Sequence, residues 1–180
     1  MESDELVARA RRAYELGRLR RALRVSAVVL PIVAVSLLVA RNALASGVTG
    51  AALLAAAVTF RWRGRALGAA VGPGLLAGLI PFALLVTLKC SAGYACMFEG
   101  CMTHCVRFCG GGGLAAGLLL AVYARRREDD VNRFLLAGGV VAALTGLLGC
   151  FLGGVMGAVW MAVGEMTATL PAVAWELRRR

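Results

Sequence analysis

Long apolar runs alternate with short arginine-rich blocks along this chain of 180 residues. A first group of runs covers residues 25–40, 47–60, 66–88 and 110–124, and a longer apolar stretch follows from 134 to 177. The runs show neither strict alternation nor a polar helical face, and about 20 apolar residues are enough for one helix to cross a bilayer. The pattern therefore predicts an all-α protein, a polytopic transmembrane helical bundle.

The last apolar stretch holds 44 residues between Arg133 and Arg178, with Glu165 as the one charge in its interior. At about 20 residues per span, this length accommodates two helices and a turn, which we place at Phe151–Gly154. A single long, tilted helix is the alternative. Two helices here bring the prediction to six spans, the first of them short and kinked at Pro31.

The basic residues indicate how the bundle is oriented. Seventeen of the 20 arginine and lysine residues fall in the blocks 9–24, 61–65, 125–133 and 178–180. With six spans these blocks lie on one side of the membrane, and only Arg41, Lys89 and Arg107 lie on the other. The positive-inside rule then places the N-terminus and the C-terminus in the cytoplasm.

Residues 1–24 form a basic juxtamembrane segment ahead of the bundle of residues 25–180. Leu16, Leu19 and Leu23 share one face of a helix, so the segment is predicted to be an amphipathic helix at the membrane interface. A twin-arginine signal before the first span and a cleavage site near Ala45 are the alternative. We favour an uncleaved topology anchor because five further apolar helices follow.

Composition supports a membrane environment and argues against nucleic acid. Apolar residues make up 60% of the chain, and the mean hydropathy is +0.78. The net charge of +10 comes from blocks between apolar runs, without the interleaved aromatic residues of a nucleic-acid surface. The lipid bilayer is thus the expected partner. The arginine-rich, lysine-poor composition favours a bacterial inner membrane.

A cysteine-rich loop is predicted at residues 89–113, on the extracytoplasmic side. It holds five of the six cysteines, and the sixth lies at the outer end of the fifth predicted span. An even number of cysteines on the oxidising side favours disulfides. The candidates are Cys90, Cys96, Cys101, Cys105, Cys109 and Cys150.

Metal binding is a second interpretation of the same loop. In a helix, Cys101, Cys105 and Cys109 would share one face, with His104 at its edge. Thiolate and imidazole ligands suit copper or zinc, although the spacing matches no common zinc motif. No cofactor is predicted otherwise. Thiol redox chemistry ranks third, because the chain has no CxxC pair.

Glu165 is the only acidic residue deep in a predicted span. Intramembrane carboxylates are costly and commonly mark ion or proton sites. A structural role is the alternative, in which the carboxyl group is protonated or has a threonine such as Thr87, Thr145, Thr167 or Thr169 as hydrogen-bond partner. Pairs of glycines four residues apart also predict close helix packing, either within the bundle or against a protein partner or a second copy.

The chain also shows a weak internal similarity. Residues 51–63 resemble 115–127, and residues 67–82 resemble 136–151, so each half would form a helix, an arginine-containing turn and a second helix. Sequences rich in alanine and leucine also align with themselves by chance, so an internal repeat and a chance similarity both stay open.

Three classes of function are compatible with these features. The favoured class is a non-enzymatic subunit or assembly partner of a membrane complex, with a disulfide-stapled outer loop. The alternative is a small carrier or channel that handles copper or zinc through the loop and Glu165. The third is a membrane thiol-disulfide oxidoreductase. An enzyme is not favoured, since the sequence shows neither a phosphate-binding glycine loop nor a catalytic triad.

Overall fold

The computed structural model describes residues 2–39, 42–92, 101–126, 131–150 and 155–179. Its regular elements in these ranges are helices, as the hydropathy pattern predicts. They are α1 (Glu2–Ser26), α2 (Val29–Val39), α3 (Ala43–Arg63), α4 (Arg65–Ala92), α5 (Cys101–Arg125), α6 (Val131–Cys150) and α7 (Val155–Arg179).

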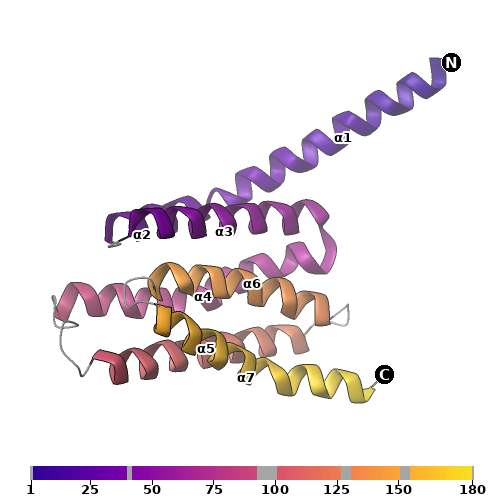
Figure 1. The fold of residues 1–180 in the computed structure, drawn as a ribbon. Coiled ribbons are helices and arrows are strands. Elements are labelled where there is room, and N and C mark those ends of the chain that lie inside the picture. The colour runs from indigo at the N-terminus through magenta and orange to yellow at the C-terminus, as the bar shows by residue number, and fades with distance from the viewer. Residues whose placement is uncertain (1, 40–41, 93–100, 127–130, 151–154, 180) are drawn as a thin grey trace.

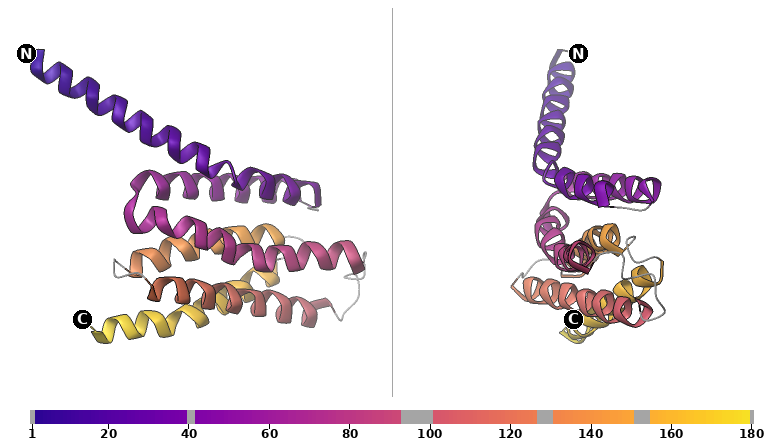
Figure 2. Two further views of the ribbon diagram at one scale, coloured as in Figure 1. Left: turned by 180° about the vertical axis from the view of Figure 1, so that it is seen from behind. Right: turned by 90° about the vertical axis from the view of Figure 1, so that its left-hand side faces the viewer.

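The helices form three layers of two, with α1 projecting away from them (Figure 1 and Figure 2). Helices α2 and α3 make one outer layer, α4 and α6 the middle layer, and α5 and α7 the other outer layer. One apolar cluster fills the space between α2–α3 and the middle layer, and a second lies between the middle layer and α5. The middle layer is therefore covered on both faces.

Helices α4 and α6 run in the same direction and lie in close contact. A Cβ added at Gly74 would lie 2.7 Å from the Gly138 carbonyl oxygen, and one at Gly78 would lie 2.6 Å from that of Ala142. Both pairs are 64 residues apart, so the contact advances along both helices together. Small residues allow this approach of two backbones.

Helices α5 and α7 pack against each other in the same way. A Cβ at Gly113 would meet the Met161 carbonyl oxygen, and one at Gly117 would lie 2.7 Å from that of Glu165. The order of these contacts makes α5 and α7 parallel. Close packing through the predicted Gly74/Gly78 pair is thus observed inside the bundle, whereas the packing through Gly113 and Gly117 was not predicted. The predicted contact with a partner or a second copy stays a prediction.

Helices α6 and α7 form an antiparallel hairpin. Gly146 lies against the side chain of Met161, and a Cβ at Gly139 would be 3.3 Å from Glu165 Oε1. Residue numbers rise along one helix as they fall along the other. The prediction of two helices between 134 and 177 is confirmed, and the single long helix is wrong. The proposed turn at 151–154 lies outside the described residues.

Within the described residues, four helices are long and apolar enough to cross a membrane, over Ala43–Arg63, Ala66–Thr87, Arg107–Arg125 and Val131–Gly149. A fifth is obtained if α1 and α2, bent by 44° at their junction, count as one span. Helix α7 is not among them, because Glu165 and nearby threonines interrupt its apolar character. Six spans and their orientation stay a prediction.

The bend between α1 and α2 has a local cause. Pro31 has no N–H to donate to the Ala27 carbonyl, and its ring crowds that carbonyl. The Leu30 amide donates to Ala27 at 3.0 Å instead, in the tighter geometry of a turn. The kink predicted at Pro31 is confirmed. Alone, the 11 residues of α2 would reach about 16 Å, half of the hydrocarbon thickness.

The C-terminal part of helix α1 contacts α3, whereas its N-terminal part projects away from the bundle. Its buried side chains within the described set are Ala22 and Ser26, near the junction with α2, whereas Leu16 is 65% exposed. The predicted leucine face is not covered by this chain. An interfacial location for α1 remains a prediction.

The arginine blocks gather at one end of the bundle. The turn between α3 and α4, the end of α5, the start of α6 and the C-terminal end of α7 lie together there, and α1 extends outward at the same end (Figure 1). Helix α4 ends and α5 begins at the opposite end. Two helical hairpins, α3–α4 and α5–α6, therefore repeat the same order and direction, in line with the internal similarity.

Candidate functional site

The predicted cysteine-rich loop is shorter in the structure than residues 89–113. Residues 89–92 belong to α4 and 101–113 to α5. The glycine run 110–113 continues as helix, and α7 packs on Gly110 and Gly113 while α4 packs on Gly112. These contacts help to compensate for the low helix propensity of glycine. Cys101, His104, Cys105 and Cys109 therefore share one helix, as the metal interpretation requires.

The chemistry of this helix stays a prediction. The side chains of Cys101, His104 and Cys105 lie outside the described residues, as do those of Cys90, Cys96 and Cys150. Among the side chains that are described, no group of three or more His, Cys, Asp or Glu residues is placed to hold a metal ion. Disulfide pairing and metal ligation of the cysteines are both left as predictions.

Cys109 does not lie in a loop, as its neighbours in the sequence suggest, but in helix α5. Its side chain is 0% exposed and packs with Leu85 of α4 and Met161 of α7 in a small apolar cluster. It therefore lies inside the helical bundle, where α4, α5 and α7 meet. Sequence reasoning missed this because a cysteine next to four glycines resembles a loop.

Glu165 is enclosed by three helices. Its side chain is 6% exposed, and Oε1 has no hydrogen-bond partner among the described residues. The glycines of neighbouring helices make room for it: a Cβ at Gly139 of α6 would lie 3.3 Å from Oε1, and one at Gly113 of α5 would lie 3.1 Å from the Glu165 amide nitrogen. The carboxyl group thus points to α6 while its backbone rests on α5.

The threonines expected to bind Glu165 bond to their own helices instead. Thr145 Oγ1 donates to the Val141 carbonyl at 2.8 Å, and Thr167 Oγ1 donates to that of Val163 at 2.7 Å. Thr169 Oγ1 donates to the Glu165 backbone carbonyl at 3.0 Å, not to the carboxyl group. Thr87 Oγ1 likewise donates to the Ala83 carbonyl at 2.8 Å. The predicted threonine partners are wrong, because a threonine in a helix readily bonds to the carbonyl one turn before it.

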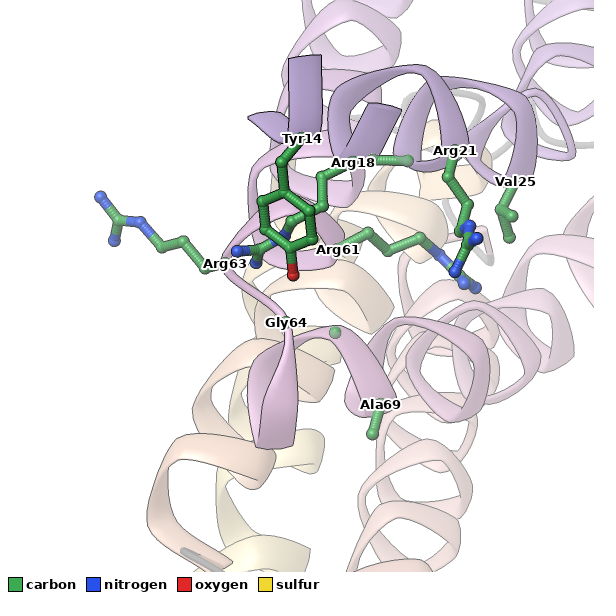
Figure 3. A pocket seen from close by; sticks show the side chains of 10 residues that line it. Tyr14, Arg18, Arg21, Val25, Arg61, Arg63, Gly64 and Ala69 are labelled. Atoms are coloured by element: carbon green, nitrogen blue, oxygen red, sulfur yellow. The ribbon is translucent and has the colours of Figure 1, made fainter. Parts of the chain in front are cut away.

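A second feature is a basic cavity of about 590 Å³ at the arginine-rich end (Figure 3). Helix α1, the end of α3 and the start of α4 enclose it. Its lining residues are Tyr14, Arg18, Arg21, Ala22, Val25, Arg61, Arg63, Gly64, Gly68 and Ala69. Sequence reasoning assigned the blocks 9–24 and 61–65 to topology separately, and only the fold brings them together.

The turn at Gly64 shapes this cavity. Gly64 has a φ of 69°, a conformation that suits glycine, and its amide donates to the Phe60 carbonyl at 3.1 Å to end α3. Arg18 Nη2 donates to the Trp62 carbonyl oxygen of the same turn. The α3–α4 turn is therefore attached directly to α1.

Comparison of the chain with known protein families, with curated proteins and with solved structures gave no match. Across the described ranges the fold is all-helical, with four, and up to five, candidate spans, which suggests a multi-pass membrane protein.

Proposed function

We propose that this protein is a non-enzymatic subunit or assembly partner of a membrane complex, with both termini in the cytoplasm of a bacterial cell. The exposed helix α1 is the observation that supports this proposal. It extends away from the bundle, and the large apolar residues Val7, Tyr14, Leu16 and Leu23 on it are exposed. Most helical stability in proteins comes from packing of a helix face, so the exposed apolar residues of this 25-residue helix would gain stability from a surface outside the chain.

A protein partner suits α1 better than lipid alone. A helix that lies on a membrane carries its apolar residues on one face and its charges on the other. In α1, arginines occur on all sides of the helix, and α1 is bent by only 44° from α2, midway between continuing the span and lying flat. Basic residues on every side fit a contact that surrounds the helix.

Site-specific photo-crosslinking tests the partner of α1. With a photoreactive residue at Leu16 we expect one discrete protein adduct from native membranes. The matched control is Leu136, which is 64% exposed on α6 within a candidate span and is expected to capture lipid only. Lipid adducts alone from position 16 would contradict a protein partner and would support the interfacial alternative.

A disulfide-stapled outer loop belongs to the same proposal. Intact mass under alkylating conditions, with and without reductant, counts the bridges directly. We expect three disulfides from the six cysteines and no bound metal by elemental analysis. Six alkylated thiols together with copper or zinc would contradict the staple and favour the metal interpretation.

A small ion or metal carrier is the second candidate, and the carboxyl group of Glu165 favours it. Glu165 Oε1 is buried without a hydrogen-bond partner among the described residues, and an intramembrane carboxyl group of this kind is commonly part of a proton or ion site. In this proposal copper or zinc enters from the cysteine-rich end of α5. Because α5 packs against α7, Glu165 of α7 would then lie beside the route that the metal ion takes along α5.

A further inference from the structure

We propose that the basic cavity between α1 and the α3–α4 turn binds the phosphate-bearing headgroup of an anionic phospholipid. The ligand site is independent of the proposed subunit role. It is formed by Arg18 and Arg21 of α1 and Arg61 of α3, and Gly64 and Gly68 also line it.

The cavity has an excess of positive charge. Four of its ten lining residues are arginines, which stay protonated at any physiological pH, and none is acidic. Within the described part of the chain, no carboxylate forms an ion pair with Arg18, Arg21 or Arg61, whereas Glu5 and Arg9 pair one turn apart, at 4.0 Å, toward the far end of α1. Like charges that share a cavity repel each other, so an external anion would stabilise this arrangement.

The arginine side chains are positioned to donate hydrogen bonds to an anion. Figure 3 shows Arg21 and Arg61 directed to the same side of the cavity, while Arg63 extends away from it. Arg61 Nε is buried and has no hydrogen-bond partner among the described residues. An unpaired buried donor is costly, and a phosphate oxygen would satisfy it. Guanidinium groups bind phosphate through pairs of parallel hydrogen bonds.

The remaining lining residues favour a lipid over a free phosphate ion. Ala22, Val25 and Ala69 add apolar surface beside the arginines, and Tyr14 lies at an exposed edge. Trp62, next to Arg61, is 43% exposed. Tyrosine and tryptophan at the ends of spans are typical of the headgroup level of a bilayer. A cavity of about 590 Å³ also exceeds the need of a single phosphate group and suits a whole headgroup.

Binding there would connect α1 to the bundle. The headgroup would bridge Arg21 on α1 and Arg61 on α3, in addition to the hydrogen bond from Arg18 to the Trp62 carbonyl. Basic pockets between helix ends are suited to such headgroups. The bound lipid would thereby set the angle at which α1 leaves the membrane.

Native mass spectrometry of the full-length protein in neutral detergent tests the site. With equimolar phosphatidylglycerol and phosphatidylcholine, we expect the protein to retain phosphatidylglycerol preferentially. The double substitution Arg21→Gln/Arg61→Gln is expected to lower that affinity by about tenfold or more, because two charge-assisted contacts are lost. Arg21→Lys/Arg61→Lys keeps the charge and removes the forked geometry, so an intermediate loss is expected.

The matched control is Arg9→Gln/Arg12→Gln, which removes the same charge from exposed α1 outside the cavity and is expected to keep the affinity within about twofold. An equal loss in this control would show general charge attraction and overturn the proposal, as would unchanged binding by Arg21→Gln/Arg61→Gln. Inorganic phosphate as competitor separates the two sources of phosphate. Displacement of the lipid only at a large excess of phosphate supports the lipid, whereas tight binding of phosphate alone overturns the lipid assignment.

Discussion

Alanine at Gly113 is expected to lower the free energy of unfolding by about 1–3 kcal/mol, whereas alanine at Gly111 is expected to raise it by up to about 1 kcal/mol. A Cβ at Gly113 would meet the carbonyl oxygen of Met161 and would lie 3.0 Å from its carbonyl carbon. Both are backbone atoms of α7, which move only if the whole helix moves. At Gly111 there is no atom within 4 Å of the added Cβ.

The two glycines are two residues apart in one run of one helix, so the gain in helix propensity from alanine is the same for both. Their difference therefore measures the α5–α7 contact alone. Thermal unfolding in detergent, followed by fluorescence-detected size exclusion, gives the comparison. Equal stability of the two variants would mean that α5 and α7 do not pack through Gly113.

The α4–α6 contact offers the same comparison. A Cβ at Gly78 would lie 2.6 Å from the Ala142 carbonyl oxygen. A Cβ at Gly72 would have no described atom outside its own stretch of helix within 4 Å. If both parallel pairs hold the bundle together, Gly78→Ala and Gly113→Ala each destabilise it. Because the two contacts use different helices, their effects are expected to add.

Lysine at position 165 is expected to prevent stable folding, at a cost of about 3 kcal/mol or more, whereas glutamine is expected to be tolerated. The site has room for a side chain of the length of glutamate, since a Cβ on Gly139 would already lie 3.3 Å from Oε1. The longer, positively charged lysine side chain would enter this buried region. Among the described residues, Glu165 Oε1 itself has no hydrogen-bond partner there. Yield and thermal stability of the purified variants measure this difference.

The glutamine variant also separates the two proposed functions, because it keeps the shape of glutamate and removes the exchangeable proton. A carrier would lose copper, zinc or proton flux in proteoliposomes through Glu165→Gln, with its stability retained. A non-enzymatic subunit would show no flux in either form and would keep its crosslink from α1. Flux that persists in the glutamine variant would exclude Glu165 from the transport path.

Hydropathy and charge were sufficient to predict the helices but not their surroundings. The apolar runs at 47–60, 66–88 and 110–124 lie within α3, α4 and α5, because the apolar character of a segment is a local property of the sequence. For Glu165 the sequence singled out an unusual carboxyl group. It did not predict the partners correctly, because Thr145 bonds within α6 although α6 packs against α7.

The sequence by itself determined that the chain is helical, rich in bilayer-length apolar segments, and basic in the blocks between them. Only the tertiary structure decided that Cys109 lies in the core, that Gly113 supports the backbone of Glu165, and that Arg21 meets Arg61 around one cavity. The physical reason is the range of the interactions. Hydrophobicity and backbone hydrogen bonding act within one helix, whereas these sites depend on which helices pack together, at what register and in which direction.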